Sequence, residues 1–280
     1  MTTRTESKSV TLGAPVLSVA EFHDFQRMIY AEAGIHMTDS KRTLVAGRLA
    51  KRVKALSLRS YADYWHYLCQ DPTEQQTAID LLTTNETYFF REEKHFDFLQ
   101  DQILPHHDPQ QPMRIWSAAC SSGEEPYTIA MVLAEGLGQQ RRWEVLASDI
   151  SNQVLDRARA GCYPLSRSKR IPQDLLKRYC LRGTGGAEGT LLVDSSLRAR
   201  VSFAQINLNT TLPNIGTFDV IFLRNVMIYF NLETKQQIVS RLIRRLRPGG
   251  YFIVGHSESL NGFQNGLDTV SPSVYQAKPK

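Results

Sequence analysis

Two adjacent carboxylates and a run of small residues stand where a short apolar segment passes into an apolar-periodic one. The segment 114–117 is followed by Ala-Ala-Cys-Ser-Ser-Gly and then by Glu124 and Glu125. Small residues let the backbone approach a ligand closely, and the first turn of a helix carries free N–H groups. Two carboxylates would repel a phosphate, so the pattern favours a ligand with positive charge. The alternative is a strand–helix junction that serves stability alone.

Further polar residues follow other apolar segments that are typical of strands. Asp149, Asn207 and the pair Arg224-Asn225 each come directly after or soon after such a segment. The carboxyl ends of parallel strands share one edge of a sheet, where ligands bind in open α/β folds. Asp149 lies about 26 residues past Gly123, where doubly wound folds place a carboxylate that accepts ribose hydroxyls. The alternatives are an ordinary helix cap at Asp149 and a capped loop after the last of these strands.

Motifs for phosphates and metals are lacking. The chain contains neither G-x-G-x-x-G nor G-x-x-x-x-G-K-[ST], which disfavours dinucleotide and triphosphate ligands. A nucleoside with a cationic part fits the acidic turn better. His106 and His107 are adjacent rather than four residues apart, and nothing near them in the sequence completes a metal site. We therefore expect no metal.

The stretch Asn85-Glu-Thr-Tyr-Phe-Phe-Arg91 separates two helical patterns. An arginine beside two aromatic residues is either a buried structural cation or an anchor that binds a carboxylate through two parallel hydrogen bonds. A second polar group, which contains Tyr229, follows the buried strand that ends before Arg224.

Helical periodicity extends from Val19 to about Thr84. Between residues 41 and 59 there are seven basic residues and no acidic one. Part of this charge lies beside the apolar stripe of the helix expected at 41–56, on Lys41, Arg48, Lys51 and Arg52. A cluster of one sign indicates a docking surface for an acidic partner, and a solvated helix face is the alternative.

Strands and helices alternate in the remainder of the chain, which predicts a doubly wound parallel sheet. The last predicted helix covers residues 232–246 and is followed by Pro248-Gly-Gly. Residues 162–196 interrupt the alternation and predict an inserted hairpin subdomain with a glycine-rich loop from Arg182 to Gly189. That loop is either a plain turn or leaves a strand edge exposed for a peptide to pair with.

Composition is that of a globular protein without a membrane span. The 280 residues, 42% of them apolar and 22% charged, suffice for one large domain or a large and a small one. No apolar run approaches the ~18 residues that a span requires. The polar N-terminus lacks a signal-peptide core, so we expect a cytoplasmic protein with residues 1–15 disordered and four reduced cysteines. The net charge of +5 permits an acidic partner.

The chain resembles the chemotaxis receptor methyltransferases, the CheR family of protein-glutamate O-methyltransferases. The blocks N-x-T-x-F-F-R and R-N-V-M-I-Y-F are distinctive, and both occur in order. The late strand after Pro-Gly-Gly, with another near the terminus, is similar to the closing hairpin of many S-adenosylmethionine-dependent methyltransferases. Over nearly the whole chain the resemblance rests on N-E-T-Y-F-F-R, S-A-A-C-S-S-G-E-E-P-Y, A-S-D-I, I-N-L, F-L-R-N-V-M-I-Y-F and G-H-S-E.

The resemblance implies an α/β fold with two domains. Residues 1–84 would form a small all-α domain that docks the receptor, and residues 85–95 a linker that contributes to the active site. Residues 96–280 would form a doubly wound, Rossmann-like domain that binds S-adenosylmethionine and carries an antiparallel β subdomain at about 162–196.

The implied activity is methyl transfer from S-adenosylmethionine to glutamate side chains of chemoreceptors, giving glutamyl methyl esters and S-adenosylhomocysteine. Arg91 and Tyr229 would face the substrate carboxylate and act in catalysis. The implied cofactor contacts are Asn85, Thr87, Arg91, Glu125, Asp149, Asn207, Leu208, Arg224 and Asn225.

The resemblance also implies two partners. The receptor's cytoplasmic helical bundle would dock on the basic helix. A receptor C-terminal tether peptide would bind the β subdomain at Arg182, Gly183, Gly185 and Gly186, and here the loop is long and glycine-rich, as in members that tether. We expect a monomer that binds no nucleic acid and does not insert into the membrane.

The chemistry agrees with these residue types. A glutamate carboxylate is already an anion at neutral pH, so its methylation needs no general base. The enzyme must place the carboxylate in line with the activated methyl group and partly desolvate two opposite charges. A site with Arg and Tyr, but without a His–Asp or Cys–His pair, suits that task.

Two other functions compete with this interpretation. A nucleic-acid methyltransferase could dock through the basic helix, but it would need aromatic stacking residues beside the catalytic edge, and the chain lacks an N-P-P-Y-like signature. A non-catalytic adaptor could bind S-adenosylmethionine or receptor tails, but Arg91, Asp149 and Tyr229 are all intact.

Overall fold

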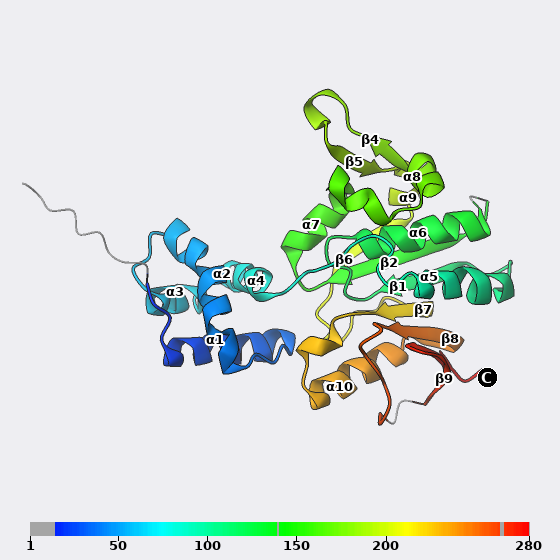
Figure 1. Cartoon of the computed structure of the whole chain (residues 1–280). Coiled ribbons are helices and arrows are strands. Elements are labelled where there is room, and N and C mark those ends of the chain that lie inside the picture. The colour runs from blue at the N-terminus through cyan, green and yellow to red at the C-terminus, as the bar shows by residue number, and fades with distance from the viewer. Residues whose placement is uncertain (1–14, 139, 264–265, 280) are drawn as a thin grey trace, which may run out of the picture.

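The computed structural model describes residues 15–138, 140–263 and 266–279. Residues 1–14, most of the segment predicted to be disordered, lie outside the described part. The described chain forms a helical N-terminal unit, a seven-stranded sheet covered by helices, and a separate three-stranded sheet (Figure 1). This arrangement confirms the predicted α/β fold class. Among the described residues, no helix has the length and apolar character needed to cross a bilayer.

Four α-helices make up the N-terminal unit, as the helical periodicity predicts. Aromatic and aliphatic side chains such as Phe25, Leu49 and Tyr64 form its buried core. Ser18 and Glu21 form a reciprocal capping box at the first helix, which fixes where it begins. The helices are α1 (Val19–Ala33), α2 (Arg42–Ala55), α3 (Tyr61–Leu68) and α4 (Pro72–Leu82).

The large sheet has the strand order β6-β2-β1-β7-β8-β10-β9. The first five strands are parallel, and β10 is antiparallel to both of its neighbours. The carboxyl ends of the five parallel strands therefore lie at one edge. The strands are β1 (Met113–Ser117), β2 (Trp143–Asp149), β6 (Val201–Gln205), β7 (Phe218–Leu223), β8 (Leu246–Val254), β9 (Leu267–Ser271) and β10 (Val274–Ala277).

Helices cover both faces of this sheet because alternate residues of its buried strands point to opposite sides. Ile115 and Phe222 belong to one apolar cluster, whereas Trp116 and Ile221 belong to the other. The first cluster includes residues of α5 (Lys94–Phe98), of the π-helical turn Leu99–Ile103 that continues it, and of α6 (Glu124–Leu137). The second includes α10 (Leu232–Ile243).

The predicted end of the last helix is wrong. α10 ends at Ile243, and Leu246 already pairs with Phe218 as part of β8. The segment Pro248-Gly249-Gly250 lies inside this strand, at a shift in register, rather than before it. Leu246 is buried in the sheet's apolar cluster, so tertiary packing outweighs its helix propensity. Strand β9 was not predicted, because its mostly exposed residues lack an alternating apolar pattern.

The inserted subdomain is confirmed as a three-stranded antiparallel sheet in the order β3-β5-β4 (Figure 1). Because β5 is central, β4 is an edge strand, and its Leu181 side chain is 54% exposed. The elements are β3 (Cys162–Pro164), the 3₁₀ segment η4 (Leu165–Arg170), α8 (Gln173–Tyr179), β4 (Cys180–Arg182) and β5 (Thr190–Val193). α7 (Asn152–Ala160) leads into it, and α9 (Ser195–Arg198) leads back to the large sheet.

Candidate functional site

A pocket with about 850 Å³ of empty space, part of it open to solvent, lies at the carboxyl edge of the large sheet. Its walls come from the end of α1, from the linker after α4, and from the loops that follow β1, β2, β6 and β7. All the residues predicted to contact the cofactor, together with Tyr229, line it: Asn85, Thr87, Arg91, Glu125, Asp149, Asn207, Leu208, Arg224 and Asn225.

The acidic turn after β1 places one carboxylate in the pocket and buries the other. Gly123 has φ +96°, and a Cβ there would lie 2.8 Å from the Cβ of Ala158, so this tight turn requires glycine. Glu125 lines the pocket, where it accepts hydrogen bonds from Ser117 Oγ (2.7 Å) and Arg224 Nη1 (2.7 Å). Glu124 is 1% exposed and pairs instead with Arg167 at 3.1 Å. Only Glu125 of the two is therefore available to a ligand.

Asp149 is a buried carboxylate held by two backbone groups. Its Oδ2 accepts from the N–H of Ser121 (2.9 Å) and its Oδ1 from the N–H of Ser151 (3.0 Å). Burial raises the pKa of Asp149 against the opposing effect of these hydrogen bonds. Asp149 does not cap α7, because the first N–H groups of that helix, on Asn152 and Gln153, donate to Asp80 at 3.1 and 3.2 Å. A carboxylate has about four acceptor positions, so Asp149 can still accept a hydrogen bond from a ligand hydroxyl.

Arg224 is a buried cation that joins the two acidic residues on either side of it. Its side chain is 1% exposed, and Nη1 donates to Glu125 while Nη2 donates to Glu92 Oε2 at 3.1 Å. Nη2 also donates to the backbone carbonyl of Arg91. The pocket wall is thus tied to the linker that carries Arg91, one of the two predicted catalytic residues.

Asn225 adopts the left-handed conformation with φ +56°, which is uncommon for a residue other than glycine. Glu258, which is 8% exposed, holds it there. Glu258 Oε2 accepts from the N–H groups of Asn225 and Gly255, and Oε1 accepts from the N–H of Met227, each at 2.8 Å. We interpret Glu258 as the residue that positions the loop after β7.

Sequence reasoning missed this role. In the sequence, Glu258 was noted only as part of the G-H-S-E block. Its position just after β8 could have indicated a role in the site, because β8 ends at the same edge as the strands that carry the other site residues.

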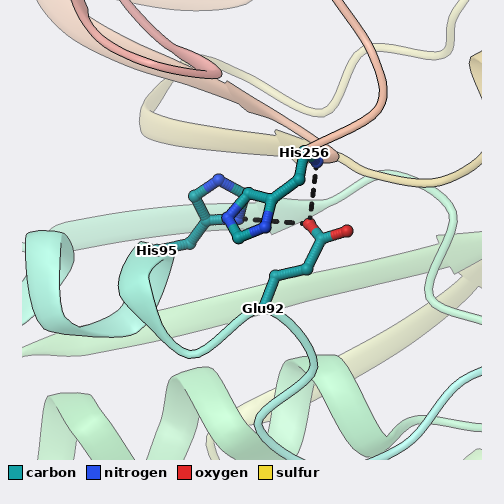
Figure 2. Close-up of side chains that lie close together, drawn as sticks. All are labelled: Glu92, His95 and His256. Carbon is teal, nitrogen blue, oxygen red and sulfur yellow. Dashed lines mark hydrogen bonds and ion pairs between the residues drawn. The ribbon is translucent and has the colours of Figure 1, made fainter.

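Glu92, His95 and His256 form a polar cluster behind Arg224 (Figure 2). Glu92 accepts hydrogen bonds from Arg224, from the Asn225 side chain (3.0 Å) and from the N–H of His256 (3.1 Å). His95 is 2% exposed, and burial lowers its pKa to about 3, so its 3.6 Å contact with Glu92 is not an ion pair. The cluster supports Arg224 and Asn225 from the side away from the pocket.

The same three side chains are the one group, within the ranges that the structure describes, whose donor atoms could surround a metal ion, all lying within 4.8 Å of one another. Glu92 already receives the Arg224 guanidinium, so a bound cation would face that positive charge. His106 and His107 belong to no such group among these residues. The absence of a metal stays a prediction.

The N-terminal unit closes one side of the pocket. Ala33 and Ile35 line it, and Ile35 forms an isolated bridge with Phe230 next to Tyr229. Asn207 donates from Nδ2 to the carbonyl of Glu32 (2.6 Å), which ties the loop after β6 to the end of α1. Asn207 therefore has a structural contact as well as a place in the pocket wall.

The basic residues of α2 differ in their surroundings. Arg48 donates to the carbonyls of Leu82 (2.6 Å) and Thr83 (3.0 Å), and since Thr83 lines the pocket, α2 flanks the pocket. Arg52 makes two hydrogen bonds to Glu74, at 2.8 and 2.5 Å. Lys51 is exposed, and so is Lys41, which directly precedes α2. Half of the predicted docking cluster thus has partners inside the N-terminal unit.

We expect Arg52→Ala to destabilise the protein by on the order of 3 kcal/mol, because Glu74, which is 2% exposed, would lose its counter-charge. Urea unfolding checks this, with exposed Lys51→Ala as the matched control, expected within about 0.5 kcal/mol of wild type. Equal stability of the two variants would show that Arg52 is a surface cation after all.

Comparison with known proteins identifies the family. Residues 20–83 match the model described as "CheR methyltransferase, all-alpha domain", and residues 85–275 match "CheR methyltransferase, SAM binding domain". "Chemotaxis protein methyltransferase 2" of Pseudomonas aeruginosa is 44% identical over 94% of this chain and 97% of its own length. The "Chemotaxis protein methyltransferase" of Salmonella typhimurium is 42% identical over 92% and 90%, and that of Escherichia coli 42% over 92% and 91%. With both family models matched and relatives this similar over nine-tenths of its length, the chain belongs to the CheR methyltransferase family.

Proposed function

We propose that this protein transfers a methyl group from S-adenosylmethionine to glutamate side chains of chemoreceptors in the cytoplasm, as part of chemotactic adaptation. The observation that carries the proposal is the pocket at the carboxyl edge, where every residue predicted to contact the cofactor meets. The names of the relatives support the chemotactic role.

The residues present fit the cofactor. Asp149 offers carboxylate oxygens to ribose hydroxyls at the end of β2, and Glu125 adds a second acidic group for a ligand that carries positive charge. S-adenosylmethionine supplies an activated methyl group on a sulfonium. Asn85, Thr87, Asn207 and Leu208 complete the walls, with Arg224 and Asn225 held from behind by Glu92.

The substrate carboxylate would meet Arg91 and Tyr229, which both line the pocket. Arg91 Nη1 donates to the carbonyl of Glu86 (2.6 Å), which orients its guanidinium. Since the substrate is already an anion, these residues align it with the methyl group and replace the water it loses. Tight binding of the ground-state anion would not by itself raise the rate.

Receptor docking would use two surfaces. On the N-terminal unit, α2 and the turn before it offer exposed basic residues, among them Lys51 and Lys41, to an acidic helical bundle. On the inserted subdomain, the edge strand β4 offers its unpaired side to a C-terminal receptor peptide. The glycine loop beside it has room for a peptide, because a Cβ on Gly185 or Gly186 would meet nothing within 4 Å. We expect the protein to be a monomer, which would carry both of these surfaces.

Gly183 tests the peptide site. A Cβ there would lie 2.0 Å from the carbonyl oxygen of Ala187, so Gly183→Ala must shift the loop next to β4. We expect it to weaken binding of a receptor C-terminal peptide at least tenfold, about 1.4 kcal/mol, and to leave cofactor affinity unchanged. Gly47→Ala is the matched control, because Gly47 lies on α2, outside the subdomain, where a Cβ would meet nothing within 4 Å. Equal peptide binding by both variants would reduce the loop to a plain turn.

Methyl transfer itself is tested with labelled S-adenosylmethionine and receptor-containing membranes. The expected result is base-labile label on the receptors, which is diagnostic of glutamyl methyl esters. Label on added RNA or DNA, or none on the receptors despite measurable cofactor binding, would overturn the proposal in favour of a nucleic-acid methyltransferase or an adaptor.

A further inference from the structure

A second group of basic residues lies beside the pocket, and most of its members come from the inserted subdomain rather than from the N-terminal unit. We call it the basic lip. Three of its members, Arg167, Lys169 and Arg170, lie on the 3₁₀ segment η4 and are exposed, and the fourth is Arg91 of the pocket wall. Arg91 is proposed to bind the substrate carboxylate, but no function has yet been proposed for the other three residues.

Specific contacts hold the lip against the pocket. Arg167 Nη1 donates to the carbonyl of Thr87 (2.7 Å), a pocket residue, and to Glu124 Oε1 (3.1 Å). Because Glu124 is almost fully buried at the start of α6, this ion pair anchors η4 to the large sheet. The segment is therefore fixed relative to the reacting groups.

Tyr88 orders two of the cations. The guanidinium carbon of Arg170 lies 4.6 Å from the centroid of its ring, and that of Arg91 lies 5.6 Å from the same centroid. An arginine that stacks on an aromatic face keeps its N–H groups available for a carboxylate and loses little freedom on binding one. In the part of the chain that the structure describes, no carboxylate lies within 4.0 Å of Arg91, Lys169 or Arg170.

We propose that the basic lip binds a second carboxylate of the substrate helix, about one helical turn from the glutamate that is methylated. The proposal rests on the proposed function, because it takes the first carboxylate to be at Arg91. Since both guanidinium carbons lie near one ring, at most about 10 Å separates them. Side chains three or four residues apart on a helix have Cβ atoms about 5–6 Å apart, and Glu and Arg are long enough to span the difference.

The basic lip would therefore select among the glutamates of the substrate. A glutamate with an acidic neighbour on the same helix face would be methylated in preference to one with an apolar or basic neighbour, because only the first fills both cationic positions. Docking on α2 would bring the bundle to the enzyme, and the basic lip would decide which carboxylate of that bundle enters.

The first experiment compares Arg170→Glu with Lys177→Glu in receptor methylation. Lys177 is an exposed cation of the same subdomain, on α8, where its neighbour Arg178 binds Glu135 near the carboxyl-terminal end of α6, away from the pocket. Both variants change the net charge equally. We expect kcat/KM for receptor-containing membranes to fall about tenfold in Arg170→Glu at low salt and to change less than twofold in Lys177→Glu. Equal rates for the two variants would overturn the proposal.

The second experiment changes the substrate. In a receptor cytoplasmic fragment, acidic residues three and four positions either side of a mapped methylation site are replaced by glutamine. At that site wild type and Arg170→Glu should then methylate the fragment with similar kcat/KM, since the second carboxylate that Arg170 would bind is absent. A tenfold gap that persists on the neutralised fragment would show that Arg170 acts through something other than that carboxylate.

Tyr88→Leu tests the aromatic platform. Arg170→Ala and Tyr88→Leu should each reduce kcat/KM severalfold. The double variant should lose less than the product of the two single losses, because the ring acts partly through Arg170 and only the remainder through Arg91. Fully additive losses would contradict that dependence.

Cofactor affinity, measured by calorimetry, should match wild type in Arg170→Glu, which separates a lip defect from misfolding. Wild type that transfers no methyl group to receptors would refute the proposed function itself, whereas wild-type transfer without any effect of Arg170→Glu would refute only the lip.

Discussion

Asp149→Ala is expected to weaken S-adenosylmethionine binding roughly ten- to a hundredfold, since the ribose hydroxyls would lose a charged acceptor worth ~1.5–3 kcal/mol. The loss should appear in calorimetric affinity and not merely in turnover. The N–H groups of Ser121 and Ser151 would also lose their acceptor, so the loop around the ligand would loosen.

Asp149→Asn separates these two effects. The amide oxygen can still accept one of the backbone N–H bonds, but the charge is gone. We expect its thermal stability to lie between those of wild type and Asp149→Ala, with cofactor affinity clearly reduced. Unchanged affinity in a folded Asp149→Ala protein would remove this residue from the cofactor site.

Glu258→Gln should have an effect of similar size although Glu258 does not line the pocket. The carboxylate accepts three backbone N–H groups, and a glutamine amide would direct an NH₂ group at some of them. Leaving one or two buried donors unpaired costs on the order of 2–4 kcal/mol of stability. Asn225, held at φ +56°, would lose its restraint, so we expect turnover and cofactor affinity both to fall at least tenfold.

The matched control is Ser257→Ala, one residue away and exposed, which should leave stability within about 0.5 kcal/mol of wild type. Chemical unfolding and calorimetry check both variants. If Glu258→Gln binds the cofactor as tightly as Ser257→Ala does, the loop after β7 keeps its shape without this carboxylate.

The sequence could predict which residues meet at the sheet edge, because the parallel arrangement of the strands largely determines where their ends lie. Asp149 ends one parallel strand and Asn207 and Arg224 follow two others, and parallel strands bring their ends together whatever the details of packing. The same reasoning placed the inserted subdomain, whose turn residues are local signals.

The partners of charged side chains could not be predicted in this way. Arg48 and Arg52 look like surface charges in a helical pattern, but their acceptors lie 22 to 36 residues away on and just after α4. Glu92 and Glu258 likewise come together across 166 residues through Asn225, which hydrogen-bonds to both. Such contacts depend on the tertiary arrangement, for which the local spacing carries no signal.

The bridge between Ile35 and Phe230, with the bond from Asn207 to Glu32, has a thermodynamic consequence. A ligand in the pocket touches both the N-terminal unit and the large sheet, so its binding free energy adds to the interface between them. A cofactor bound there would therefore stabilise the contact between the N-terminal unit and the sheet, and a receptor docked on α2 would in turn change the affinity for the cofactor.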